Sequence, residues 1–221
     1  MIHMFRAVLY TQWKWSRLIV VLGTIAAFAI PLLSVQGAAR ADRGALQAQD
    51  LLRSVQSWGS LYPLLATALG LFMAMAAWAP DHRGRHIHAL TLPLERWRYV
   101  LLRFGAGFAL LAAPIAAVLL GALLATWTGT LPPGLQAYPI ALAVRFAFAV
   151  FVAYAVFFAV SAGTARTAGI ILAVIAALIL VQVFASMANL DLDLFGAAQT
   201  ALLLGPGPLA VFAGRWMLVD V

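Results

Sequence analysis

Hydrophobic residues along this chain are grouped in long blocks, with polar residues confined to the stretches between them. Five blocks are long enough to cross a hydrocarbon core of about 30 Å as helices. They are residues 18–35, 61–78, 99–127, 139–160 and 168–187. The short alternating segments typical of a membrane barrel do not recur. The pattern predicts an all-α, polytopic transmembrane helical bundle, with one domain over residues 1–221.

The two ends of the chain differ from these blocks. Residues 1–17 mix Trp13 and Trp15 with basic residues. Because such rings favour the headgroup level, an interfacial helix is predicted there. Residues 188–221 are apolar but broken by Gly205-Pro206-Gly207-Pro208. They form either a broken sixth span or a pair of re-entrant or interfacial helices. The second interpretation is favoured, because each half is too short to cross a bilayer alone.

Composition supports a membrane location. Of 221 residues, 65% are hydrophobic and 10% are charged, whereas soluble domains average about half apolar and about a quarter charged. The net charge of +7 could indicate a nucleic-acid ligand, but basic residues flanking spans explain it better. With the N-terminus inside, nine of the 14 Lys and Arg residues lie on inner segments. The positive-inside rule then predicts a cytoplasmic N-terminus in a cell (inner) membrane.

The sequence lacks the usual residues of several chemistries. It has no cysteine, which excludes disulfides, thiolate metal sites and a cysteine nucleophile. No Gly-x-x-x-x-Gly-Lys-Ser/Thr pattern occurs, and the single lysine is Lys14, so ATP phosphates cannot be held by that route. No pair of acidic residues falls within the predicted spans. We therefore expect a protein that is not an enzyme and has no cofactor in this chain.

The segment between the second and third spans carries the most information. The loop at 79–98 is longer than most connections between helices. It combines a charged entry with an apolar run that Pro93 interrupts. A short amphipathic element of this kind at the membrane surface is suited to docking a partner protein.

The order of residues in this loop resembles the cytoplasmic loop of type-2 ABC exporter permeases. The residues that carry the resemblance are Asp81, Gly84, Leu90-Thr91-Leu92-Pro93-Leu94, Arg96, Tyr99-Val100-Leu101 and Arg103. The motif covers residues 79–103, and the order of the spans extends the likeness over most of the chain. A clean sixth span is missing, which is a departure from the family.

The resemblance implies the membrane subunit of an ATP-driven exporter. Such a subunit pairs with a second permease subunit, as a homodimer or heterodimer, and binds a separate cytoplasmic ATP-binding subunit that uses the ATP. The loop would act as a coupling helix moved by that subunit. The residues expected to dock it are Asp81, Gly84, His86, Leu90, Leu92, Pro93 and Arg96. The alternatives are a membrane scaffold that transports nothing, and an ion-coupled carrier, against which the shortage of buried acidic groups argues.

Several further residues have two interpretations. The histidines at 82, 86 and 88 suit a partner-facing surface better than a metal site, because Arg83 and Arg85 would repel a cation. Arg145, within the fourth span, either snorkels to the headgroups or lines a pathway. Arg103 is expected to anchor the inner end of the third span.

The third span also carries a stripe of small residues, formed by Gly105, Ala109, Ala112 and Ala113. Small residues let helices approach closely. Packing within one subunit is favoured over a dimer seam. The Ala, Leu, Val and Phe of the spans do not identify a substrate.

Overall fold

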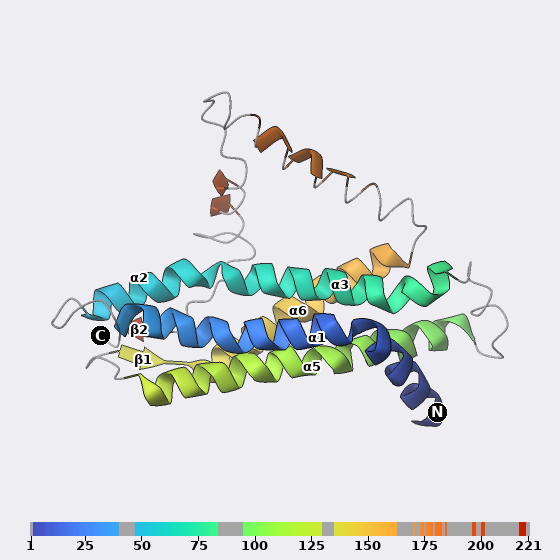
Figure 1. The fold of residues 1–221 in the computed structure, drawn as a ribbon, viewed down its shortest axis with the longest axis horizontal. Helices are drawn as coiled ribbons and strands as arrows, with labels where there is room; N and C mark the ends of the chain where they lie inside the picture. Colours follow the sequence, from blue (N-terminus) through green and yellow to red (C-terminus); the bar gives the residue numbers. More distant parts are fainter. Residues whose placement is uncertain are drawn as a thin grey trace.

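The computed structural model describes residues 2–39, 47–83, 95–129, 135–162 and 217–219, and scattered residues between 170 and 201. Nearly all of them are helical (Figure 1). The elements are α1 (Ile2–Ala39), α2 (Gln47–Gly59), α3 (Leu61–Arg83), α5 (Arg96–Thr128), β1 (Leu135–Ala137), α6 (Pro139–Ser161) and β2 (Met217–Val219).

Four helical stretches are long and apolar enough to cross a membrane. They are Met4–Gln36, Leu51–Asp81, Trp97–Thr128 and Pro139–Ser161. The all-α prediction and the first four predicted spans are confirmed to this extent. A fifth span at 168–187 and the alternatives for 188–221 are not confirmed, because most of those residues lie outside the described part of the chain.

The start of the chain differs from the expected division into an interfacial helix and a span. Residues 2–39 form one continuous helix, α1, with Pro31 inside it. At 1.5 Å per residue it is roughly 57 Å long, well over the hydrocarbon thickness of about 30 Å. One end of α1 or both therefore extends beyond a membrane core. Residues 2–17 remain candidates for the headgroup level.

The four long helices α1, α3, α5 and α6 pack side by side as a bundle. α1 lies against α3 and α5, and α6 completes the ring against the same two helices (Figure 1). Fully buried side chains such as Met73, Leu111 and Val150 fill the centre. Large apolar side chains such as Leu18 and Leu22 are exposed outside. An apolar exterior of this kind suits lipid rather than water.

Glycines let neighbouring helices come close together. A Cβ at Gly70 of α3 would lie 2.7 Å from the backbone N of Tyr154 in α6. A Cβ at Gly121 of α5 would lie 2.5 Å from the carbonyl O of Phe28 in α1. The predicted packing role of the small-residue stripe is wrong, because Ala109, Ala112 and Ala113 are exposed. Their helix turns this face away from the core.

The two ends of the bundle can be told apart. The loop end is where α3 finishes at Arg83 and α5 begins at Arg96, on either side of residues 84–94. The strand end carries β1, which follows α5 and pairs antiparallel with β2, with Leu135 opposite Val219. Since α6 runs back from β1, it finishes at the loop end.

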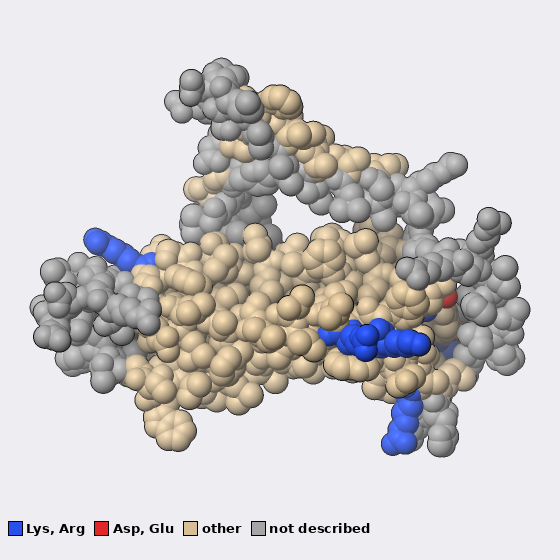
Figure 2. Space-filling view, in the orientation of Figure 1, with Lys and Arg blue, Asp and Glu red and all other residues tan. Residues whose placement is uncertain are grey.

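Positive side chains are unevenly divided between these ends. The exposed cations of described residues at the loop-end half are Arg6, Lys14, Arg17 and Arg98, whereas Arg53 is exposed at the strand end. Figure 2 shows most of the blue side chains toward the loop end, on the right. The asymmetry has the sense that the positive-inside rule associates with a cytoplasmic loop end.

Candidate functional site

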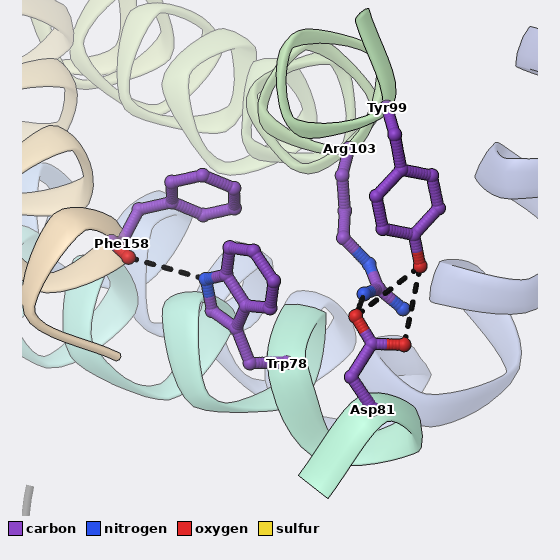
Figure 3. A network of polar contacts seen from close by, with 5 residues as sticks. All are labelled: Trp78, Asp81, Tyr99, Arg103 and Phe158. Atoms are coloured by element: carbon purple, nitrogen blue, oxygen red, sulfur yellow. Dashed lines mark hydrogen bonds and ion pairs between the residues drawn. The ribbon is translucent and has the colours of Figure 1, made fainter. Parts of the chain in front are cut away.

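A buried ion pair joins α3 and α5 at the loop end. The Arg103 guanidinium donates to a carboxylate oxygen of Asp81, and the two side chains are only 9% and 2% exposed (Figure 3). The Tyr99 hydroxyl lies 3.1 and 3.2 Å from the two oxygens of the same carboxylate, to which it donates. Arg103 and Tyr99 lie one helical turn apart on α5, so both can reach Asp81.

Aromatic rings surround the positive member of this pair. The Arg103 guanidinium carbon lies 5.3 Å from the centroid of the Trp78 ring and 5.0 Å from that of Tyr99. Both distances allow cation–π attraction. The Trp78 indole N–H donates to the carbonyl oxygen of Phe158 at 3.1 Å (Figure 3). The cluster, which we call the Asp81 network, therefore connects α3, α5 and α6.

Burial makes each member of the pair dependent on the other. Removing a carboxylate and a guanidinium from water costs several kcal/mol per ion, and their mutual attraction offsets this only with good geometry. The hydroxyl of Tyr99 and the rings over Arg103 add the partners that the pair needs. If one ion is lost, the other stays buried without a partner.

The Asp81 network also brackets the predicted docking loop. Asp81 and Arg103 are 22 residues apart in sequence, and residues 84–94 lie between them. The buried contact therefore joins the two helices that precede and follow that segment.

The structure describes only part of the predicted docking set. Asp81 lies inside the bundle, at 2% exposure, and does not face outward. Arg96 is the first residue of α5. The others, Gly84, His86, Leu90, Leu92 and Pro93, lie outside the described residues. Arg103 does not act as a free interfacial anchor, because it is paired within the bundle.

The remaining candidates give no new chemistry. No group of three His, Cys, Asp or Glu that could hold a metal occurs among the described residues. The histidines at 86 and 88 lie outside those residues. Arg145 lies near the strand end of α6 and is partly buried. Both interpretations of Arg145 stay open.

A pocket beside the Asp81 network was not foreseen from the sequence. It has a volume of about 250 Å³ and lies between α1, α3 and α5. Its wall includes Gln12, which is 4% exposed. Its amide nitrogen and oxygen make no hydrogen bond of normal geometry, and the Tyr154 hydroxyl lies beside them. The sequence gives no signal for the burial of Gln12, because this residue lies in a segment whose aromatic and basic residues suggested an interfacial helix.

Comparison with protein-family models, with characterised proteins and with solved structures finds no match to this chain.

Proposed function

We propose that this chain is the membrane subunit of an ATP-driven exporter of the type-2 ABC permease class, powered by a separate cytoplasmic ATPase. The observation that carries the proposal is the Asp81 network, which joins α3 and α5, the helices on either side of residues 84–94. The ATPase would press on the loop, and the buried pair would pass that displacement to α3 and α5. The resemblance of the loop residues to the family supplies the identity of the partner.

Within this proposal Asp81 and Arg103 have a positioning role. They hold the ends of the loop, while Gly84, His86, Leu90, Leu92, Pro93 and Arg96 provide the surface for the ATPase. A second permease subunit would complete the pathway. The concentration of exposed cations at the loop end supports a cytoplasmic location for that end and for the N-terminus, in the cell membrane.

The orientation can be tested because the natural chain has no cysteine. Single cysteines are placed at His86, at Thr128 and at Leu218, and intact cells are treated with a membrane-impermeant maleimide. Thr128→Cys and Leu218→Cys should be labelled, because Thr128 and β2 lie at the strand end. His86→Cys should be labelled only after the cells are permeabilised. Labelling of His86→Cys on intact cells would refute the proposal, since an ATPase could not reach it.

Docking is tested by coexpressing this chain with an ABC-type ATPase encoded in the same gene cluster and purifying the two together. The two proteins should copurify, and Leu92→Glu in the loop should abolish the association. Ser57→Glu, an exposed position of α2 near the strand end, is the matched control and should retain it. Equal retention by both variants would show that the loop is not the docking surface.

An ion-coupled carrier is the second candidate, because the structure buries a carboxylate that the sequence did not place in the interior. Buried carboxylates are the groups that ion-coupled carriers use along their ion pathways. The two functions are separated in liposomes that contain this chain alone. Solute uptake driven by a pH gradient without ATP would favour the carrier over the exporter.

A further inference from the structure

The pocket beside the Asp81 network is open on one side and mostly apolar. Ala7 and Val8 of α1 and Ala76 and Pro80 of α3 form much of its wall. At about 250 Å³ it is larger than the roughly 150 Å³ cavity that takes a single benzene ring. It is smaller than the roughly 300–1,000 Å³ of most drug-binding pockets. A ring with a short chain is the size of molecule that it accommodates.

Most polar groups in the wall already have partners. Arg103 is paired with Asp81, and the Tyr99 hydroxyl donates to the same carboxylate. The Thr11 hydroxyl donates to the Ala7 carbonyl oxygen at 2.9 Å. Since Asp81 neutralises Arg103, the wall offers neither an unpaired cation nor an unpaired anion to a ligand.

Gln12 is the exception. Neither polar atom of its amide makes a hydrogen bond of normal geometry, although the Tyr154 hydroxyl lies beside it. The side chain is only 4% exposed. A buried amide without partners is costly and calls for an explanation. Gly107 leaves room for it, because a Cβ there would lie 2.8 Å from the amide nitrogen of Gln12. The side chain offers one donor group and one acceptor from the same point of the wall.

We propose that this pocket binds a small uncharged amphiphile, with its apolar body against the alanines, Val8 and Pro80 and its polar group paired with the Gln12 amide. An amide or hydroxyl group on the ligand satisfies both the donor and the acceptor of Gln12. A charged ligand is disfavoured, because it would lose its hydration without gaining an opposite charge. The proposal does not depend on the exporter assignment.

The test uses a cysteine introduced at the rim. Thr11→Cys puts the single thiol of the chain in the pocket wall, and its rate of reaction with N-ethylmaleimide is measured. The probes are 3-phenylpropanamide, 3-phenylpropanoate and 3-phenylpropylammonium, which share a skeleton and differ in charge. The amide should slow labelling several-fold at saturation, and the two ions should not. The control is Thr128→Cys, because Thr128 is also exposed and its hydroxyl also donates to a carbonyl oxygen of its own helix. This variant should react equally with or without each probe.

Two second-site variants identify the contacts. Adding Gln12→Leu to Thr11→Cys should remove the protection by the amide probe, and adding Val8→Phe should remove it by filling the pocket. Val8→Phe carries the test if Gln12→Leu does not fold, as judged by its elution on gel filtration. Absence of protection, equal protection by all three probes, or protection that survives both variants would overturn the proposal. The first of these outcomes would leave water or the Tyr154 hydroxyl as the partner of Gln12.

Discussion

At the loop end, α3 and α5 are joined by two opposite charges, whereas halfway along the bundle α3 and α6 are joined by a glycine against a backbone. The charged contact is the Asp81–Arg103 pair with Tyr99. The steric contact is Gly70, which lies so close to α6 that a Cβ would fall within 3 Å of Tyr154 N. One contact depends on the presence of two opposite charges, and the other depends on shape alone.

This difference indicates where the bundle can move. Interlocked backbones tolerate little sliding, because close-packed interiors are stiff. The loop end has a pocket, a buried amide without a hydrogen bond of normal geometry, and a contact between two charges. Elements with two discrete arrangements are the ones that switch. We expect displacement to begin at the loop end while the contacts at Gly70 and Gly121 stay fixed.

The largest effect is expected from Arg103→Leu, which breaks the charged contact. It leaves the Asp81 carboxylate buried without a partner and should lower the free energy of unfolding by about 3–5 kcal/mol. The measurement is chemical unfolding of the purified protein in one detergent. Arg98→Leu is the matched control, because its pair with Glu95 is exposed (46% and 59%) and should be worth at most about 1 kcal/mol.

The double variant Asp81→Leu/Arg103→Leu sharpens this prediction. It removes both charges, so it should be less destabilised than Arg103→Leu alone. A loss equal to the sum of the two single losses would mean that the ions act independently. The charged contact would then not be what joins α3 to α5.

The steric contact is broken by Gly70→Ala. The new methyl group meets the backbone of α6 at 2.7–2.8 Å, and overpacking of this kind typically costs about 1–3 kcal/mol. Gly105→Ala is the control, because its Cβ would meet only a side-chain atom of Phe5 at 3.8 Å. That variant should be neutral, or more stable by up to about 1 kcal/mol through helix propensity. Equal effects of the two substitutions would contradict the assignment of Gly70 as a packing contact.

The apolar helices that make the steric contacts could be predicted from the sequence better than the charged contact could. Apolar block length was enough to place α3, α5 and α6, because lipid demands helices of a minimum length. It did not show which face of each helix turns inward. In α5, which is rich in alanine, the sequence does not distinguish the stripe from Gly105 to Ala113 from the face that carries Gly107 and Gly121. It is the face with Gly107 and Gly121 that lies against the neighbouring helices.

The charged contact could not be predicted, because its residues are distant from one another in the sequence. Asp81 looked like part of an exposed loop, because its partner Arg103 lies 22 residues away. The pairing of β1 with β2 joins three-residue strands about 80 residues apart, which is too short for any periodic signal. The burial of Gln12 also had no signal in the sequence. The candidate site was therefore visible in its residue types but not in its geometry.

Tyr99→Phe tests the charged contact more gently. It removes one hydroxyl that donates to the Asp81 carboxylate and should cost about 1.5 kcal/mol, the lower limit for hydrogen bonds to charged groups. In the Arg103→Leu background the cost should change, because both residues share Asp81. Tyr138→Phe removes an exposed hydroxyl bonded to Gln136 at 3.1 Å and should be within about 0.5 kcal/mol of the natural protein. Equal losses for the two tyrosines would mean that Tyr99 is no more than a surface residue.

The smallest effect is expected from Gln12→Leu. Replacing an unpaired buried amide by an apolar side chain of similar size removes a desolvation cost, so unfolding should become harder by about 1 kcal/mol. Gln56→Leu, at an exposed position of α2, should change stability by less than about 0.5 kcal/mol. A loss of stability in Gln12→Leu would mean that the amide is satisfied in the empty protein, by water or by the nearby Tyr154 hydroxyl. The loop end would then be as fully bonded as the middle of the bundle, and the contrast between the two regions would rest on the ion pair alone.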